Sequence, residues 1–492
     1  MSPARADAPT RDRVGGRVTA KAPRRLPAVA LLACVAVAVA IVAGGGELNY
    51  DLAFALTWGQ DVLAGRAPDF ELALAPTAHP LTTGLGILAA PFSPQAGVLA
   101  MHWTAYLSLV AVLVLVFALG RELAGWPAGL VAAVPVAISP AFLTATSAGF
   151  QDVTAAALIL GAVLLVMRAP RCGAAVLVLL ALAGLLRPEA WGLAAAYWLY
   201  MLPGASRGLR VRLAVLAATG PLGWALVDLA ITGQPLLSLT HTRDSADSLR
   251  RVTGLGEVPG QLRVHLDRML GPAVLAGAVA GVAASFARPA RFAAVRVPIA
   301  TGVLLGVSFA ALGAAEVSLL ARYLLVPGAL LAVLFAVALL GWRDLGASRG
   351  RTAWMLGAAA LALGAVALVP HQISMSDDQL RAQRVDGRVV DDLLALVDEP
   401  AARAAAARCG PLAVTHHVTR PYVALQLGRP VGDIALADAG RALPAAVVAP
   451  ASADSASFLS RGADTSEPPS APPATRRLAG NASWELWSGG CR

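Results

Sequence analysis

Five carboxylates follow the first long apolar run of the chain. They lie in the stretch "GELNYDLAFALTWGQDVLAGRAPDFE", residues 46–71: Glu47, Asp51, Asp61, Asp69 and Glu71. Acids at the exit of a membrane helix are either solvated residues that flank the helix or the working groups of an enzyme. A positioned carboxylate can take a proton from a reacting group, which contributes roughly 10²–10⁴ in rate. These residues are therefore the first candidates for chemistry.

The composition indicates an integral membrane protein. Hydrophobic residues make up 57% of the 492 residues and charged residues only 14%, with a mean hydropathy of +0.66. Soluble domains are about 45–50% apolar and about 25% charged. The net charge of +9 first suggests nucleic-acid binding. However, the arginines lie in short clusters between apolar runs, as they do in loops that orient a membrane protein.

Apolar runs long enough to cross a bilayer, about 17–25 residues, predict eleven spans. They are 26–46, 97–120, 126–146, 153–168, 172–188, 189–204, 212–233, 270–287, 297–316, 323–342 and 353–370. The first run could also be a signal peptide, but its length favours a span.

Positive charge predicts the orientation of these spans. Residues 1–25 form a basic tail, which the positive-inside rule places in the cytoplasm. The other loops then predicted inside are basic and carry few acids; they contain Arg121; Arg168 and Arg171; Arg207, Arg210 and Arg212; Arg288, Arg291 and Arg296; and Arg343, Arg349 and Arg351. An odd number of spans places residues 371–492 outside. The predicted organisation is a cytoplasmic tail, a transmembrane domain over 26–370, and an external C-terminal domain over 371–492.

Two long loops fall outside the membrane, 47–96 and 234–269. The first contains an expected amphipathic helix, with Leu52, Leu56 and Leu63 on its apolar face and Trp58 at headgroup depth. It ends at "GRAPDF". Pro76 and "HPL" at 79–81 then precede the second span.

The C-terminal segment predicts a small α/β domain. Residues 377–408 suggest a polar helix, "PLAV" and "AAVVA" suggest short strands, residues 452–477 suggest a loop, and "SWELWS" suggests an edge strand. The expected fold is thus an all-α polytopic membrane protein with a small α/β domain. Cys409 and Cys491 both lie in this domain and could form a disulfide in an oxidising compartment.

Several short motifs carry a family resemblance. They are the acid just past the first span, "GRAP" and "HP" in the first external loop, "ARYLLVPGALLAVLFA" at 321–336, and "ITGQPLLSLTHTRD" at 231–244. Together they resemble the GT-C superfamily of multi-spanning glycosyltransferases, akin to the protein-mannosyltransferase and aminoarabinose-transferase families, which use polyprenyl-phosphate-linked sugars. Asp51 stands in "NYD" without the adjacent second acid that many members show. This departure leaves the base and any need for Mg²⁺ or Mn²⁺ open.

The resemblance implies an inverting sugar transfer in which Asp51 is the base and Arg322 holds the lipid phosphate. Planar arginine forks suit phosphate oxygens. Seven further residues are expected to contact the substrates: Tyr323, His79, Asp152, Arg187, Glu189, Thr242 and Arg243. Asp152 could instead help to hold a divalent cation.

Most of these candidates also have a structural explanation. Asp51 could flank a helix, Arg322 could snorkel toward the membrane surface, and Asp152 could cap a helix. Similarly, Tyr323 could belong to an interfacial belt, His79 could structure its loop, and Arg187 and Glu189 could simply pair. Asp61, Asp69 and Glu71 are expected to be surface or capping residues, while Asp228 lies inside a span, where an acid is a functional candidate by default.

The expected function is transfer of a sugar from a polyprenyl-phosphate donor to an envelope glycan, lipid or protein outside a bacterial plasma membrane. Nucleic acid is not an expected partner. The main alternative is a transporter or lipid-linked-sugar flippase, which favours inverted repeats and polar residues at mid-bilayer. A third is a non-catalytic assembly scaffold, in which the loop acids would be dispensable.

Overall fold

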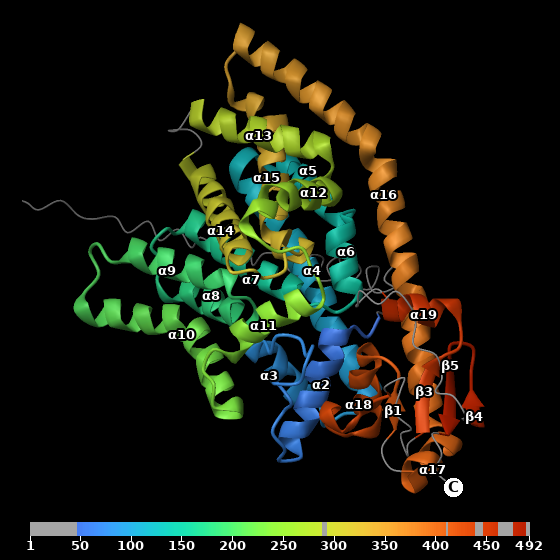
Figure 1. Ribbon diagram of the computed structural model, residues 1–492. Helices are drawn as coiled ribbons and strands as arrows, with labels where there is room; N and C mark the ends of the chain where they lie inside the picture. Colours follow the sequence, from blue (N-terminus) through green and yellow to red (C-terminus); the bar gives the residue numbers. More distant parts are fainter. Residues whose placement is uncertain (1–46, 288–292, 410–411, 438–445, 461–475, 489–492) are drawn as a thin grey trace, which may run out of the picture.

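The computed structural model describes residues 47–287, 293–409, 412–437, 446–460 and 476–488. Most of this part is a bundle of helices, and a small sheet lies at one end of it (Figure 1). The helices of the bundle are α2 (Tyr50–Leu63), α3 (Pro80–Ala89), α4 (Pro94–Ala124), α5 (Trp126–Ala137), α6 (Pro140–Ser147), α7 (Asp152–Arg168), α8 (Ala174–Leu186), α9 (Glu189–Met201), α10 (Arg207–Thr232), α11 (Leu237–Ser248), α12 (Val258–Leu270), α13 (Pro272–Ala287), α14 (Arg296–Ala314), α15 (Leu325–Leu340) and α16 (Arg349–Asp398).

The predicted apolar runs coincide with helices. The run 26–46 lies outside the described residues, and each of the other ten overlaps a helix or, for 126–146, the pair α5 and α6, bent by 62°. Among the described residues, five helices are long and apolar enough to cross a membrane, or up to seven if each bent pair is one span. The chain is thus a multi-pass helical protein, and the count of eleven spans stays a prediction.

The expected amphipathic helix forms as α2, but every residue from Leu52 to Gly59 is buried. Leu52, Phe54 and Trp58 are each at most 2% exposed, and the ring of Trp58 contacts Phe70 instead of lying at a membrane surface. The helix α3 packs against it through Gly59 and Gly86, where a Cβ atom on either glycine would overlap the backbone of the other helix. Sequence periodicity identified one apolar face and could not show that α3 and the C-terminal domain cover the rest.

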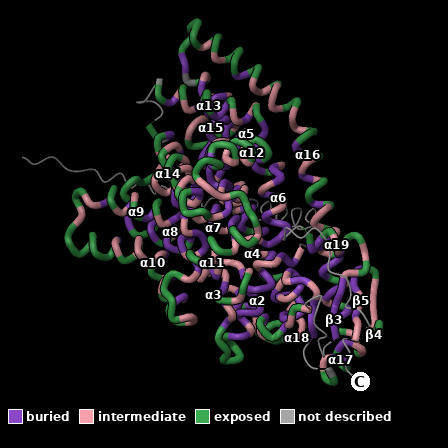
Figure 2. The backbone as a smooth tube through the Cα atoms, viewed as in Figure 1, coloured by how far each residue is buried: buried purple, intermediate pink, exposed green. Residues whose placement is uncertain are grey.

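The helix α16 joins the bundle to the sheet. It runs for 50 residues without a break, along one side of the molecule from the far end of the bundle to the C-terminal domain (Figure 1). Its first half is largely exposed (Figure 2), with Leu356, Leu363 and Val366 each more than 60% exposed. An apolar exposed face of this kind suits contact with lipid.

The C-terminal sheet has five strands in the order β2-β1-β3-β5-β4. The pairs β1/β2 and β1/β3 are parallel, and β5 pairs antiparallel with both β3 and β4. The strands are β1 (Ala413–Val414), β2 (Ala435–Leu436), β3 (Ala446–Pro450), β4 (Arg476–Gly480) and β5 (Trp484–Ser488), and the accompanying helices are α17 (Pro400–Cys409), α18 (Arg420–Leu427) and α19 (Ala453–Ser460).

Two details of this domain differ from the prediction. The "SWELWS" strand, β5, lies inside the sheet, because β4 pairs along its other side. The segment predicted as a loop over 452–477 begins with helix α19 and ends in β4. The segment is polar, but Phe458 and Leu459 of α19 are buried in the domain core. The side chains of Cys409 and Cys491 lie outside the described residues, so their disulfide stays a prediction.

One hydrophobic core holds the C-terminal domain against the loop region. It contains Leu52 and Trp58 of α2, Val390 and Leu393 of α16, and Tyr422 of α18. The sheet domain is therefore fixed over the end of the bundle where α2 begins (Figure 1).

Candidate functional site

The first turns of three helices bring acids to the same end of the bundle. Asp51, Asp152 and Glu189 lie in the first turns of α2, α7 and α9, where the helix dipole favours negative charge. Asn49 sets the first of these turns. Its Oδ1 accepts from Leu52 N at 2.9 Å, and its Nδ2 donates to the carbonyl of Ala148.

Two arginines connect these three acids. Arg322 Nη1 lies 3.0 Å from Asp51 Oδ2, and its Nε lies 3.9 Å from Asp152 Oδ1. Arg187 lies 3.1 Å from Asp152 and 2.8 Å from Glu189. The ion pair expected between Arg187 and Glu189 is therefore present, within a larger network. This network links residues of α2, α7 and α9 to the segment before α15.

Aromatic rings support both guanidinium groups. The Arg322 group lies over the ring of Phe150 at 4.5 Å from its centroid, and the Arg187 group lies over Tyr323 at 4.1 Å. Cation–π contacts of this kind hold an arginine in one orientation while leaving its N–H groups available. Tyr323 thus packs against Arg187 in the site and is not part of an interfacial belt.

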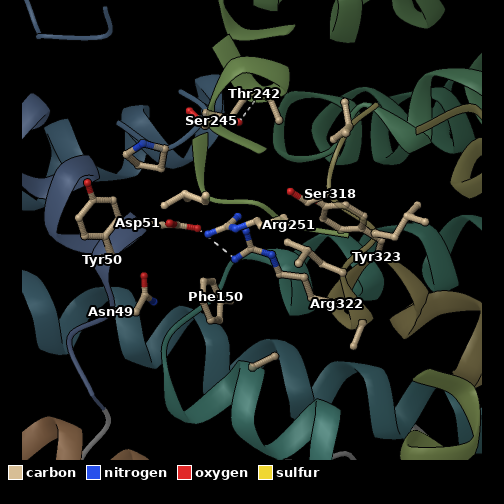
Figure 3. Close-up of a pocket in the computed structure, with 18 of the residues that line it drawn as sticks. Asn49, Tyr50, Asp51, Phe150, Thr242, Ser245, Arg251, Ser318, Arg322 and Tyr323 are labelled. Carbon is tan, nitrogen blue, oxygen red and sulfur yellow. Dashed lines mark hydrogen bonds and ion pairs between the residues drawn. The ribbon is translucent and has the colours of Figure 1, made fainter. Parts of the chain in front are cut away.

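The network faces a cavity of about 880 Å³. Figure 3 shows Asp51, Arg251, Arg322 and Tyr323 around this space, with Thr242 and Ser245 of α11 on one side. The candidate residues that line it are Asp51, Arg322, Tyr323, His79, Arg187, Glu189 and Thr242. Asp152 lines a small adjoining cavity that shares Asp51, His79 and Arg187 with the first.

His79 and Thr242 enter the cavity wall from the two loops that the sequence predicts to lie outside. Thr242 hydrogen-bonds to Thr77 and to the carbonyl of Ser238. The ring of His79 meets Trp224 edge-on at 5.2 Å. Burial, with help from the nearby Arg187, lowers the pKa of His79 to about 3, so its imidazole is neutral at physiological pH.

Arg243 does not reach the cavity. It pairs with Glu316, and both side chains are more than half exposed. Helix α11 turns Thr242 toward the cavity and the next side chain away from it, because neighbouring helical positions point in different directions.

Four other acids singled out in the sequence have structural roles. Asp61 is fully buried, contrary to the expectation of a surface or capping residue, and pairs with Arg66 at 2.8 Å. Asp69 accepts from the backbone N–H of Gly432 at 2.8 Å, while the exposed Glu71 accepts from Gln234. Asp228 accepts from the backbone N–H and the hydroxyl of Ser238, at 2.8 and 2.7 Å, and so anchors the start of α11.

Sequence reasoning missed several residues of the cavity. Arg251 and Ser318 lie in loops between helices (Figure 3), while His417, Tyr422 and Phe458 come from the C-terminal domain. The "RR" at 250–251 was a visible signal, since a basic pair in a loop predicted outside departs from the positive-inside pattern.

The donor set does not fit a divalent cation. The guanidinium group of Arg322 lies between Asp51 and Asp152, in the position that a shared Mg²⁺ or Mn²⁺ would need. Across the described part of the chain, no group of three or more acidic, histidine or cysteine side chains could hold a metal ion.

The comparison with solved structures decides the fold. ArnT from Cupriavidus metallidurans, bound to undecaprenyl phosphate, aligns over 94% of this chain and 98% of its own length, with 14% identity and a TM-score of 0.54. The chain has the GT-C fold.

Two further structures agree with this GT-C assignment. The apo form of the same ArnT also gives a TM-score of 0.54 at 14% identity, covering 95% of this chain and 98% of that one. The apo oligosaccharyltransferase of Archaeoglobus fulgidus gives a TM-score of 0.50 at 14% identity over 86% of this chain and 69% of its own. No family model and no curated protein sequence matches the chain. The GT-C architecture inferred from short motifs is therefore confirmed by structure alone.

Proposed function

We propose that this protein is a membrane glycosyltransferase that moves a sugar from a polyprenyl-phosphate donor to an acceptor hydroxyl outside the plasma membrane. The observation that carries the proposal is the carboxylate of Asp51 facing a cavity lined by four arginines: Arg187, Arg250, Arg251 and Arg322. The cavity lies at the ends of apolar helices, where a lipid headgroup and a water-borne acceptor can meet. The same fold binds undecaprenyl phosphate in ArnT.

The charges within the cavity suggest where the phosphate binds. Arg322 is compensated by Asp51 and Asp152, and Arg187 by Asp152 and Glu189. Arg251 lines the same cavity and acts electrostatically on Tyr50, beside Asp51. Within the described residues, no hydrogen bond or ion pair engages its guanidinium group. Arg251 therefore supplies the positive charge that a phosphate needs, with Arg322 beside it (Figure 3).

The reaction then proceeds by direct displacement. Oδ2 of Asp51 faces Arg322, and Oδ1 has no hydrogen-bond partner among the described residues. Oδ1 takes the proton of the acceptor hydroxyl as its oxygen attacks the anomeric carbon. The bond from that carbon to the phosphate oxygen breaks, and the polyprenyl phosphate leaves with the electron pair. The arginines stabilise the charge on the departing phosphate, and attack from the opposite face inverts the anomeric centre.

The test is sugar transfer by the purified chain in nanodiscs that contain polyprenyl-phosphate sugars extracted from envelope membranes. We expect release of polyprenyl phosphate together with a glycosylated product when envelope glycan extract is added. Movement of the donor lipid between leaflets of proteoliposomes without release of phosphate would contradict the enzyme and favour the flippase.

A further inference from the structure

One wall of the cavity is built by the C-terminal domain. Four residues of this part of the chain line it: Tyr422 of α18, Phe458 of α19, Gln383 in the second half of α16 and His417 before α18. We propose that this wall binds the acceptor and that the acceptor's bound part is an uncharged, polyhydroxylated sugar. The inference rests on the proposed function.

The polar groups of the wall have hydrogen-bonding capacity left over. Gln383 Nε2 donates to the carbonyl of Thr144 at 3.0 Å, whereas its buried Oε1 has no partner among the described residues. Tyr422 is 1% exposed, and no hydrogen bond within the described region involves its hydroxyl. A buried polar atom without a partner, such as Gln383 Oε1, is costly. The hydroxyls of a bound sugar would satisfy it and could also bond the Tyr422 hydroxyl.

These groups are also neutral. Burial raises the pKa of the Tyr422 hydroxyl well above its ordinary value, and the nearby carboxylates of Glu47, Asp51 and Asp386 raise it further. Burial also lowers the pKa of His417 to about 4, helped by the neighbouring His416 and Arg420. The wall therefore offers neutral donors and acceptors at physiological pH, which suit the hydroxyls of an uncharged sugar.

The aromatic rings of the wall suit the apolar face of a sugar. Tyr422 and Phe458 lie 6.1 Å apart between ring centroids, and the ring of His417 meets Tyr50 edge-on at 6.4 Å. Tyr50 precedes Asp51, so a sugar held on this wall would present a hydroxyl toward the Asp51 carboxylate. The shared core of α2, α16 and α18 fixes the distance between the wall and the base.

The test compares a neutral alkyl hexoside with the same hexoside carrying a 6-phosphate. Binding to the full-length chain in nanodiscs is followed by saturation-transfer NMR, and undecaprenyl phosphate binding is measured on the same samples. We expect the neutral glycoside to bind and the phosphorylated one to bind at least about 10-fold more weakly, because a charged group would lose its hydration at a wall that offers only neutral partners. Preference for the phosphorylated glycoside, or no binding of either, would overturn the proposal.

The variant Tyr422→Phe removes only one oxygen and no hydrogen bond of the described residues. We expect it to weaken glycoside binding about 3–10-fold, the range for one lost hydrogen bond, with undecaprenyl phosphate binding unchanged. The matched control is Tyr106→Phe, which removes the hydroxyl of a tyrosine on α4 outside the lining of the cavity, buried and without a partner among the described residues. Equal glycoside affinity in wild type and Tyr422→Phe would overturn the acceptor wall. If the wild-type chain itself did not bind undecaprenyl phosphate, that result would instead contradict the proposed function.

Discussion

At the scale of single residues, Arg322 organises the site. It bridges Asp51 and Asp152, carboxylates from separate helices, and so places the proposed base next to the proposed phosphate site. Because these two acids compensate Arg322, the charge available to the donor comes from Arg251.

Replacing Arg251 by Gln should weaken the binding of undecaprenyl phosphate about 10–100-fold, since hydrogen bonds to charged groups contribute about 1.5–3 kcal/mol. Surface plasmon resonance with captured nanodiscs would measure the affinity. The matched control is Arg243→Gln, because Arg243 belongs to the neighbouring loop region but pairs with the exposed Glu316. Equal affinities for the two variants would refute the role of Arg251.

His417 makes the stability of the C-terminal domain depend on pH. Its pKa in the folded protein is about 4, lowered from 6.5, so the unfolded chain takes up a proton more readily than the folded one. The neutral His417 therefore contributes to the free energy of unfolding above pH 6.5. This contribution, at most about 3 kcal/mol, is lost as pH falls from 6.5 to about 4. We expect His417→Gln to flatten the decline of the thermal unfolding temperature over that interval, and the exposed His371→Gln to retain it. Identical pH profiles for all three proteins would show that His417 does not matter.

The sequence identified much of the site at this scale because the residue types were chemically suggestive. Asp51, Arg322, Arg187 and Glu189 drew attention as charges beside apolar runs, and the structure brings them together. The sequence could not identify Tyr422, because an aromatic residue in an α/β domain is ordinarily part of its core. Nor could the sequence show that Thr242 faces the cavity and Arg243 does not, because the direction of each side chain depends on how α11 is rotated about its axis.

At the scale of elements, the acids lie in the first turns of helices and the loops carry the other walls. The helix α11 shows how one such wall is held. Asp228, near the end of α10, accepts two hydrogen bonds from Ser238 in the first turn of α11. The acid expected to be functional because of its place inside a span is thus a positioning residue.

Replacing Asp228 by Asn should loosen α11, because an amide offers one acceptor oxygen where the carboxylate offers two. We expect hydrogen exchange over 237–248 to accelerate roughly 10-fold, as for a local loss of about 1–2 kcal/mol, and transfer to fall through a higher KM. Hydrogen-exchange mass spectrometry would follow the segment. The control Asp247→Asn alters a charge on α11 itself, away from this contact. Unchanged exchange in Asp228→Asn would show that the anchor is not needed.

The helical elements were predictable because long apolar runs have few alternatives in a chain of this composition. The burial of α2 and the position of β5 were not, because both depend on contacts between segments far apart in the sequence. Asp61 illustrates the limit. Its spacing suggested a surface position, but most of α2 is buried and the acid is fully buried beside Arg66.

At the scale of the whole molecule, α16 and the shared core hold the C-terminal domain over the end of the bundle that carries the site. The proposed orientation places this end outside the cell. Cysteines introduced at the exposed positions Leu63, Leu255 and Leu436 should react with a membrane-impermeant maleimide on intact cells. Cysteines at Leu209 and Arg349 should react only after the membrane is permeabilised. The native cysteines would first be replaced by alanine, and labelling of Leu209→Cys from outside would reverse the topology.

The central claim is that Asp51 is the base of a sugar transfer, and one variant tests it most directly. Asp51→Asn keeps the size of the side chain but cannot take the acceptor's proton. In the nanodisc transfer assay its rate should fall about 10²–10⁴-fold, with undecaprenyl phosphate binding retained. Glu71→Gln, an exposed change in the same loop region, should transfer at the wild-type rate. Near-wild-type transfer by Asp51→Asn would contradict the account.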